Sequence, residues 1–423
     1  MDVVSVQVDR GSAQGSISGP ATWNLSMNRL LFILEGMNVK KVAFADDLLF
    51  LVEGGTRAEI EQRTSEVMRV VYEWGRSVGV DVSDRKTVCM VLKGSLSMCN
   101  RVVHVCLGED EVRSVRFVEC VKYLGVSMSR TMDFRVHVEG MRKKVNGTIG
   151  RLRRVLRRDW GLKKGIVSVL VKGLILPAVM YASSVWCEVL KWKRVRDELN
   201  RCQRRMLYAC TRVCRTVSTE AMQVIFGSLP WDLECMRNAN LYCARKGVLL
   251  RDESLNVLLE EEINVLDVTE RVSLVKARMN EKWQERWNMS VNGRVTYEWI
   301  RDVRFAGEVK WFDPSLRLCY VITGHGSLNS FLFSRNIADS PACVCGCERE
   351  DWLHVLCECD MYACFRDLEG MKIVWSENKW DVSGVLQERV CYERLCEYVE
   401  RAFKMRESVL GRMNVDGELR QGL

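Results

Sequence analysis

Apolar and polar residues follow two periods along this chain, and together they predict a mixed α+β protein. Two short apolar runs, 42–43 and 48–52, flank a pair of adjacent acids and predict the strands of a hairpin. Runs this apolar predict buried strands, with the acids in a tight turn at the lip of a core. Segments 57–78 and 255–285 instead carry a helical period, and the chain has only five prolines to break helices. A mostly helical body is therefore expected after the hairpin.

A loop rich in Gly and Ser precedes this hairpin at residues 13–19. Glycine lets the backbone approach a ligand closely, and Pro20 suits the first turn of a helix. The apolar positions that follow predict one face of that helix: Trp23, Leu30, Leu31 and Leu34. The expected order is loop, helix, strand, acidic turn, strand.

Asp46 and Asp47 are the candidate chemistry of the turn. Two adjacent carboxylates repel each other and lose hydration at the edge of a core, so a cation must compensate them. Divalent metals are suited to this because hard cations prefer oxygen ligands. The alternative is an ordinary solvated turn, since Asp tolerates turn geometry.

Composition adds a nucleic-acid signal. The chain has 423 residues and 48% apolar content, enough for two to four domains, and its net charge is +8. One basic cluster, with Asp159 as its only acid, comprises Arg142, Lys143, Lys144, Arg151, Arg153, Arg154, Arg157, Arg158, Lys163, Lys164 and Lys172. A second comprises Lys191, Lys193, Arg194, Arg196, Arg201, Arg204, Arg205, Arg212 and Arg215. Such clusters on helices neutralise phosphates, although a solvated surface face is the usual alternative.

Two other features bear on the environment of the protein. The 19 cysteines are scattered and odd in number, which favours reduced thiols inside the cell. The most apolar long stretch, 166–186, is interrupted by Lys172 and Pro177. It is interpreted as a buried helix rather than a membrane span, so no membrane is expected as a partner.

Three cysteines and a histidine near the carboxyl end form a candidate zinc site, because thiolates and imidazole suit tetrahedral zinc. Its residues are Cys343, Cys345, His354 and Cys359. Cys347 and Cys357 compete as ligands, and sequence does not choose among them. The alternative is a set of reduced, partly buried thiols.

These motifs together resemble the reverse transcriptases. Their palm carries a Gln-Gly loop followed by a strand-turn-strand with Phe or Tyr before Asp-Asp, and here both lie within fifty residues. Segments 79–87 and 121–126 resemble the Lys-Thr element and the primer-gripping hairpin. Segments 283–296, 323–326 and 343–359 resemble the carboxyl-terminal region of non-LTR retrotransposon polyproteins. The closest resemblance of 215–221 and 227–230 is to arthropod type-1 elements that insert into ribosomal RNA genes.

The resemblance implies an α+β chain with a partial polymerase palm, a mainly helical thumb and a small zinc-knuckle-like module. The implied divisions are 1–128 palm, 129–215 basic thumb, 216–330 helical connecting region, 331–365 zinc module and 366–423 helical tail. The zinc module would be structural and help to grip RNA or target DNA.

It also implies roles for residues. Asp46 would be the main Mg²⁺ ligand of a two-metal site, supported by Asp47, and Lys86 would lie near the departing pyrophosphate. The nucleotide and template pocket would be lined by Gln14, Gly15, Phe44 and Ala45. Implied partners are an RNA template, a DNA primer or target DNA, and deoxynucleoside triphosphates. The implied location is intracellular, with synthesis in the cytoplasm and action in the nucleus, in the nucleolus if ribosomal DNA is the target.

Some departures from the family matter. Reverse transcriptases place another catalytic Asp on a strand well upstream of the Gln-Gly loop, and neither Asp2 nor Asp9 has the expected surroundings. Ala13 stands where relatives usually have Pro. A carboxyl-terminal fragment of a larger polyprotein is therefore expected, whose parent also carries an endonuclease and which does not polymerise alone. The competing hypothesis is a non-catalytic, nucleic-acid-binding remnant of such an element.

Overall fold

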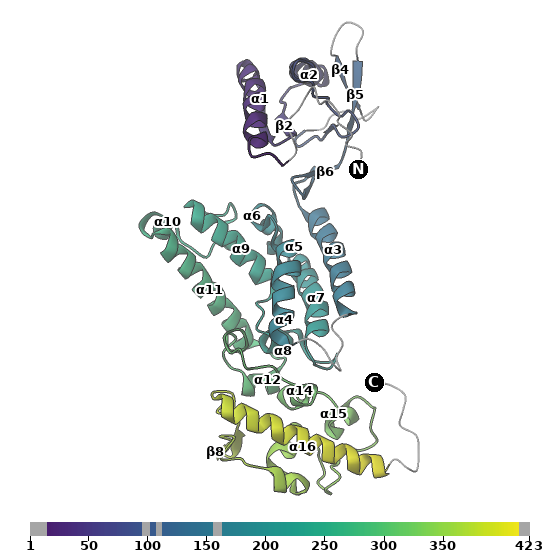
Figure 1. Cartoon of the computed structure of the whole chain (residues 1–423), viewed down its shortest axis with the longest axis vertical. Coiled ribbons are helices and arrows are strands. Elements are labelled where there is room, and N and C mark those ends of the chain that lie inside the picture. The colour runs from purple at the N-terminus through teal and green to yellow at the C-terminus, as the bar shows by residue number, and fades with distance from the viewer. Residues whose placement is uncertain (1–14, 95–101, 107–111, 155–162, 414–423) are drawn as a thin grey trace, which may run out of the picture. The chain divides into compact units, whose positions relative to one another are not determined.

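The computed structural model describes residues 15–94, 102–106, 112–154 and 163–413 (Figure 1). The chain divides into two compact units, Met1–Val136 and His137–Leu423. Within the described residues, helices predominate and the strands form four small sheets. The α+β class expected from the sequence is therefore observed.

The first unit combines two long helices with three of these sheets. Its elements are α1 (Gly19–Ile33), η1 (Leu34–Gly36), β1 (Lys40–Phe44), β2 (Asp47–Leu51), α2 (Arg57–Val78), β3 (Val88–Cys89), β4 (Val102–Cys106), β5 (Val112–Phe117), β6 (Cys120–Tyr123) and β7 (Val126–Ser129). β1 and β2 form one antiparallel hairpin, and β6 and β7 form another. β5 lies between β4, to which it is antiparallel, and β3, to which it is parallel. The helix predicted at residues 57–78 coincides with α2.

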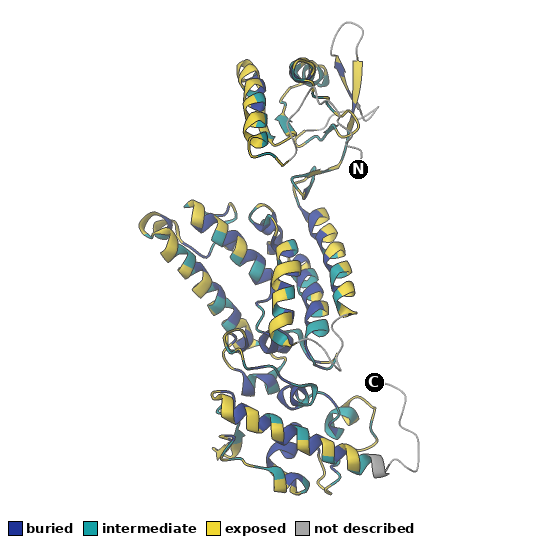
Figure 2. Ribbon diagram, viewed as in Figure 1, coloured by how far each residue is buried: buried dark blue, intermediate teal, exposed yellow. Residues whose placement is uncertain are grey.

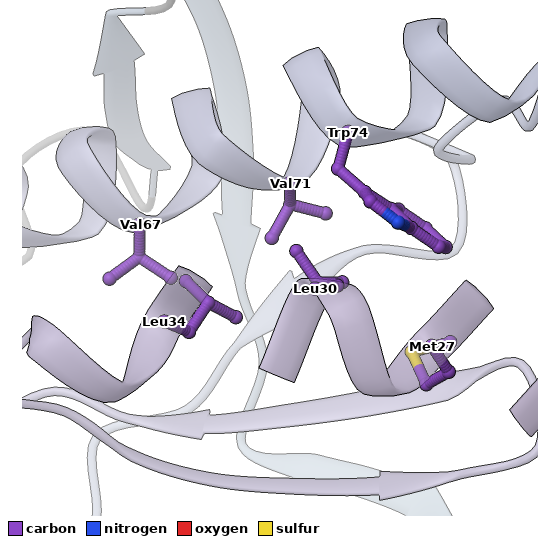
Figure 3. Packing of buried hydrophobic residues seen from close by; sticks show 6 residues of the cluster. All are labelled: Met27, Leu30, Leu34, Val67, Val71 and Trp74. Atoms are coloured by element: carbon purple, nitrogen blue, oxygen red, sulfur yellow. The ribbon is translucent and has the colours of Figure 1, made fainter. Parts of the chain in front are cut away.

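Two helices form the core next to the β1/β2 hairpin. On α1 the buried residues recur at three- and four-residue steps, and α2 presents a matching stripe, as helices that bury one face require. The six residues of this core are Met27, Leu30, Leu34, Val67, Val71 and Trp74 (Figure 3). Ala43, Leu48 and Phe50 of the hairpin pack against it. The core thus positions the hairpin that carries the two acids.

The prediction that the hairpin strands are buried is wrong. No residue of β1 or β2 is fully buried, and Val42 and Phe44 are 52% and 60% exposed. The physical reason is that a two-stranded hairpin has one face for the core and leaves the other to solvent. The apolar run reported the presence of strands correctly but not their depth.

The second unit is mainly helical. Its elements are α3 (Arg135–Arg153, which begins two residues before the boundary), α4 (Lys164–Leu170), the π-helical turn η2 (Val171–Ile175), α5 (Leu176–Met180), α6 (Ser183–Trp186), η3 (Cys187–Lys191), α7 (Lys193–Cys210), α8 (Thr219–Phe226), α9 (Trp231–Lys246), η4 (Glu253–Leu255), α10 (Glu260–Val265), α11 (Val268–Met289), α12 (Arg294–Trp299), α13 (Phe305–Glu308), α14 (Leu316–Thr323), α15 (Asn329–Ser334), the π-helical turn η5 (His354–Glu358), η6 (Asp360–Phe365), β8 (Val374–Ser376), β9 (Lys379–Asp381) and α16 (Arg389–Met413).

The predicted helix at 255–285 is broken in the structure. Asp267 ends the preceding segment and caps α11, accepting hydrogen bonds from the amides of Thr269 and Glu270. Glu270 returns a bond to the Asp267 amide, which completes a capping box. The apolar period continued across this boundary, so periodicity alone merged α10 with α11.

The apolar stretch 166–186 is half exposed, which corrects the prediction of a buried helix. On α4, η2 and α5 the buried residues lie mainly on one stripe, four residues apart: Val167, Val171, Ile175 and Val179. Met180, Ser183 and Trp186, at the end of the stretch, are buried as well. Ile166, Val169 and Leu174 on the other side are 49%, 69% and 53% exposed (Figure 2). By length and composition alone, Lys164–Lys191 could also cross a membrane. A long apolar run does not distinguish burial on one side from burial on both.

α16 is a long helix against which α14 packs in the carboxyl-terminal part of this unit. Arg317 of α14 forms ion pairs with Glu400 and with Glu407 of α16, the latter at 2.8 Å. The rings of Tyr320 and Phe403 also pack together, with centroids 6.0 Å apart. Helices distant in sequence are therefore held to one long helix.

Candidate functional site

The two acids lie in the tight turn of the β1/β2 hairpin. Phe44 pairs with Asp47, so Ala45 and Asp46 form a two-residue loop. Ala45 has a φ of 52°, whereas φ at Asp46 is negative. A positive φ at the first position of a two-residue hairpin loop is normally adopted by glycine, asparagine or aspartate. A left-handed alanine costs about 1 to 2 kcal/mol, so neighbouring structure must hold it there.

Trp23 of α1 supplies a hold on this turn. Its indole Nε1 donates a hydrogen bond of 2.9 Å to the carbonyl oxygen of Ala45. The Trp23 ring meets the Trp74 ring edge to face at 6.5 Å, and Trp74 Nε1 donates to the carbonyl of Ser26 at 3.2 Å. The sequence had marked Trp23 only as part of an apolar face. Its indole N–H, which needs an acceptor when half buried, was the available signal.

Two of the remaining predicted palm residues, Gly15 and Lys86, lie on segments separate from this turn. Gly15 has a φ of 85°, and no described atom beyond its chain neighbours lies within 4 Å of the position that a Cβ would take. Gln14 lies outside the described residues. Lys86 is exposed in the turn before β3, where its amide donates to the carbonyl of Ser83 at 3.1 Å. The structure therefore places Lys86 on a turn separate from that of Asp46.

The chemistry of the acidic turn is open. Phe44, Ala45, Asp46 and Asp47 are all exposed. Within the described residues, no third acid, cysteine or histidine joins Asp46 and Asp47 in a group able to hold a metal. Oxygen ligands suit Mg²⁺, so the donor chemistry fits, but the described part of the chain supplies only two of the carboxylates.

The part of the first basic cluster from Arg142 to Arg153 lies on α3, which buries one face and exposes the other. The buried face consists of His137, Val138, Met141, Val145 and Ile149. Of the predicted contacts on the other face, Lys143, Lys144, Arg151, Arg153 and Arg154 are exposed, and Arg142 is half buried. Arg157 and Arg158 lie outside the described residues. The exposed cations therefore lie along one side of a helix whose other side is buried in the core.

α7 runs parallel to α3. Arg142 pairs with Glu198 at 3.9 Å, the Cys202 thiol donates to Asn146 at 3.4 Å, and Arg153 lies over the Tyr208 ring at 5.8 Å. The residue numbers on α3 and on α7 increase together along these three contacts, so the two helices run in the same direction. Exposed Arg201 and Arg205 lie three residues beyond Glu198 and Cys202, on the adjacent helix row.

Several basic residues of the second cluster serve the fold itself. Arg196 donates to the carbonyls of Leu190 and Lys191 at 2.6 and 2.9 Å. Arg204 donates to Thr219 and to the carbonyl of Arg215 at 3.1 and 2.7 Å. For these two residues the structural interpretation of the charge run is the better one.

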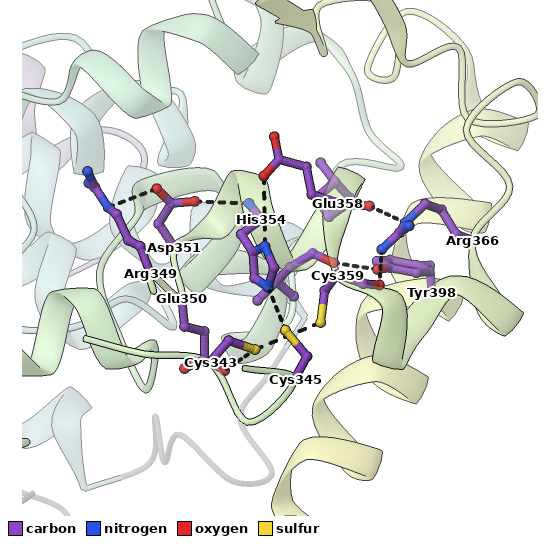
Figure 4. A network of polar contacts seen from close by, with 12 residues as sticks. Cys343, Cys345, Arg349, Glu350, Asp351, His354, Glu358, Cys359, Arg366 and Tyr398 are labelled. Carbon is purple, nitrogen blue, oxygen red and sulfur yellow. Dashed lines mark hydrogen bonds and ion pairs between the residues drawn. The ribbon is translucent and has the colours of Figure 1, made fainter. Parts of the chain in front are cut away.

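The cysteine and histidine residues predicted as zinc ligands lie together. The ligand atoms of Cys343, Cys345, His354 and Cys359 are all within 4.8 Å of one another (Figure 4). Sγ of Cys343 is 3.8 Å from Sγ of Cys359, and Sγ of Cys345 is 3.3 Å from Nε2 of His354. Gly346, with a φ of 93°, follows the tight Cys-x-Cys turn.

The competing cysteines are not part of this group. Cys347 is exposed, and its carbonyl accepts a bond from the Cys343 amide. Cys357 is buried, which raises the pKa of its thiol to about 12. Burial also raises the pKa of the Cys343 and Cys359 thiols. A buried pair of thiolates is stable only beside a cation, so the donor set suits a metal.

The histidine is arranged as metal-binding histidines commonly are. Nε2 faces the cysteines, while Nδ1 is buried without a hydrogen-bond partner among the described residues. Glu358 Oε2 lies 3.8 Å from Nδ1 on the opposite side of the ring. A carboxylate behind the ring is the usual way to fix the tautomer of a liganding histidine. The site therefore fits zinc.

Known relatives agree with this organisation. The family model described as "Reverse transcriptase (RNA-dependent DNA polymerase)" matches residues 5–128. A Pol polyprotein from type-1 retrotransposable element R1 3 of Nasonia vitripennis is 53% identical over 89% of this chain and 99% of its own length. One from element R1 of Bradysia coprophila is 40% identical over 98% of this chain and 40% of its own length. No solved structure matches.

The acidic hairpin and the family match together define an RNA-directed DNA polymerase, a reverse transcriptase. The chain belongs to the Pol polyproteins of type-1 R1 elements, which are non-LTR retrotransposons.

Proposed function

We propose that the β1/β2 turn is the nucleotidyl-transfer site of this reverse transcriptase, acting on an RNA template and a DNA primer. The observation that carries the proposal is the exposed Asp46 and Asp47 pair on a strained turn held by Trp23. Strain at a non-glycine turn position is characteristic of sites where geometry is selected for function. The first unit then acts as part of a polymerase palm.

Each residue has a role in this proposal. Asp46 is the main Mg²⁺ ligand and Asp47 supports it, while exposed Phe44 and Ala45 lie beside the primer end. Gln14 and Gly15 border the incoming nucleotide and template, and Lys86 assists the departing pyrophosphate. Two bound divalent ions would activate the primer hydroxyl and neutralise charge developing on the triphosphate.

Primer extension tests this proposal. We expect the chain alone to be inactive on a primed RNA template with Mg²⁺, because its described residues supply two carboxylates. A longer chain completed with the remainder of the Bradysia coprophila relative should extend the primer, and Asp46→Ala should abolish extension. Activity that survives Asp46→Ala would refute the assignment. Inactivity of the completed chain, with nucleic-acid binding intact, would favour a non-catalytic remnant.

We propose that α3 and α7 act as a thumb that grips template and primer. The exposed cations of α3 lie on the side of the helix opposite its buried face. Arg201 and Arg205 of α7 are exposed near the residues of α7 that contact α3. If binding depends on neutralised phosphates, the logarithm of the affinity should fall linearly with the logarithm of the salt concentration. Fluorescence anisotropy of labelled RNA between low and high salt measures that slope, and a flat response would exclude the role.

We propose that Cys343, Cys345, His354 and Cys359 hold one structural zinc ion. Four protein ligands leave no open coordination position, which is typical of structural rather than catalytic zinc. Zinc quantitation should give one ion per chain, and Cys343→Ser and His354→Ala should each lower it, whereas Cys364→Ser, at an exposed cysteine outside the group, should not. Unchanged zinc in both ligand variants would remove the proposal.

We also propose an intracellular, nuclear site of action, with synthesis in the cytoplasm. Every cysteine in the described ranges is a free thiol, which suits a reducing compartment. Immunofluorescence of the chain in insect cells would test this, and exclusion from the nucleus would contradict it.

A further inference from the structure

Glu350 lies between the proposed zinc ligands in sequence, but it is neither one of those ligands nor one of the proposed catalytic residues. Glu350 sits seven residues after Cys343 and four before His354, and its side chain is fully buried. Its Oε1 is 3.9 Å from Sγ of Cys343. A buried carboxylate beside thiolates is unfavourable unless a cation and hydrogen-bond donors satisfy it.

Arg406 of α16 supplies that cation from 56 residues away. Its Nε donates to Oε1 of Glu350 and its Nη2 to Oε2, each at 2.7 Å. This two-point geometry is the strongest form of an Arg–carboxylate pair. Both side chains are buried, with 4% exposure for Arg406.

Glu350 also joins α15 to the loop of residues 343–351, called the ligand loop below, which carries Cys343 and Cys345. Its Oε2 accepts from the amide of Asn329 at 2.8 Å, and its carbonyl accepts from the amide of Ser330 at 3.0 Å. Arg406 closes the arrangement by donating to Oδ1 of Asn329 at 2.9 Å. One residue thus connects the ligand loop, α15 and α16.

Backbone hydrogen bonds rather than an apolar core hold the ligand loop: the Cys343 amide donates to the Cys347 carbonyl at 2.9 Å, and the Glu350 amide donates to the Pro341 carbonyl at 2.7 Å. Between residues 343 and 351, only Cys343 and Glu350 are buried, and the positions between them are half buried or exposed. No apolar side chain in that stretch forms a core. A loop with so little apolar burial gains much of its stability from a bound metal, as small zinc modules do.

We propose that Arg406 is a positioning residue for the metal centre, acting through Glu350, so that zinc binding and docking of α16 are one coupled transition. This rests on the proposed zinc site and extends it. When the loop opens, Glu350 leaves its place and Arg406 is left buried without its carboxylate, which favours undocking of α16. By thermodynamic linkage, a docked α16 must tighten zinc binding by the same factor by which zinc favours docking.

Hydrogen exchange of the whole wild-type chain tests the coupling without a variant. After zinc is removed by a chelator, amide exchange should accelerate in the loop 343–359 and also in α16 around residues 395–408. Peptides of α9 and α11 should be unchanged. If α16 keeps its protection when zinc has left, the coupling is wrong.

Zinc transfer to a chromogenic chelator tests the reverse direction. We expect Arg406→Met to release zinc roughly 10- to 100-fold faster than wild type, the range seen for residues that orient metal ligands. Arg406→Lys keeps the charge but not the two-point geometry, so its rate of zinc release should lie between those of the wild type and Arg406→Met. The matched control is Arg401→Met, since Arg401 is on the same helix but exposed and pairs locally with Glu397.

The outcomes are separable. A wild-type chain that purifies without zinc defeats both the zinc site and the coupling. Stoichiometric zinc with equal release from Arg406→Met and Arg401→Met leaves the zinc site standing and overturns the coupling. Faster release from Arg406→Met alone supports it.

Discussion

The two candidate metal sites of this protein are built in opposite ways. At the β1/β2 turn, two exposed carboxylates sit on a strained two-residue loop that one indole hydrogen bond restrains. At the carboxyl end, a thiol and imidazole set lies within one loop, with a buried ion pair behind it. The first site is open and incomplete within the described residues, while the second offers four ligands.

The difference follows from what each site must do. A polymerase exchanges nucleotide, primer and pyrophosphate at every step, so its metal ligands must face solvent and substrate. A structural metal is bound once and should be closed to solvent. Under these proposed roles, the hairpin takes its support from the core of α1 and α2, whereas a bound zinc ion would stabilise the residues around it.

Removal of metal should separate the two sites most strongly. Chelation of zinc should destabilise the carboxyl-terminal part by several kcal/mol, less than the about 10 to 16 kcal/mol with which zinc-finger peptides bind the ion. Omission of Mg²⁺ should leave thermal unfolding unchanged, because the hairpin folds on its own core. Calorimetry with zinc-loaded, zinc-free and Mg²⁺-free protein measures both. Equal effects of the two metals on unfolding would erase the distinction.

The two acids should be unequal in catalysis. In the completed polymerase, we expect Asp46→Asn to lower the extension rate about 10³-fold, at the upper end for loss of a charge-stabilising group, and Asp47→Asn about 10- to 100-fold. Zinc content should be unchanged in both. Asp81→Asn, at an exposed position in the same unit, is the control for loss of one charge. A larger loss from Asp47→Asn would reverse the assigned roles.

The support of the open site should show in kinetics rather than in stability. Trp23→Phe keeps an aromatic ring, although a smaller one, and removes a hydrogen bond that contributes about 0.5 to 1.5 kcal/mol. We expect kcat to fall up to about tenfold with little change in KM for nucleotide or in Tm. Trp375→Phe, at a 55% exposed tryptophan of the second unit, should change none of these. A Trp23→Phe enzyme with wild-type kcat would show that the turn needs no such restraint.

The smallest expected effect is on the grip of α3. Arg151→Ala should reduce the slope of log affinity against log salt by about 0.7 to 0.9, the contribution of one phosphate contact. Arg389→Ala removes the same charge from an exposed position of α16 and should leave the slope unchanged. Identical slopes for the two variants would mean that net charge, and not the α3 surface, governs binding.

Local patterns in the sequence were sufficient for the hairpin and for α2, and they placed the four clustered residues among six candidate ligands without choosing between them. Each of these depends on residues close in sequence: an alternation, a helical period or a ligand spacing. Contacts between distant residues were out of reach. Nothing near Trp23 announces the carbonyl of Ala45, and nothing near Glu350 announces Arg406.

Depth was the other missing quantity. Hydropathy ranked 166–186 as the most apolar stretch, yet burial there depends on how many neighbours cover the helix, and one side has few. The same applies to β1 and β2, where an apolar run belongs to a hairpin covered on one face. Sequence reports how much a segment gains from burial, but packing decides how much of it is buried.

The parallel arrangement of α3 and α7 has a thermodynamic consequence. It gathers exposed like charges on neighbouring helices, and their mutual repulsion opposes the folded state at low ionic strength. A bound polyanion relieves that repulsion, and it binds the folded form more tightly because the cations are gathered there. Nucleic acid should therefore act as a folding ligand for the second unit, raising its apparent stability in proportion to the logarithm of free ligand concentration over Kd. The protein would be most robust when assembled with its template.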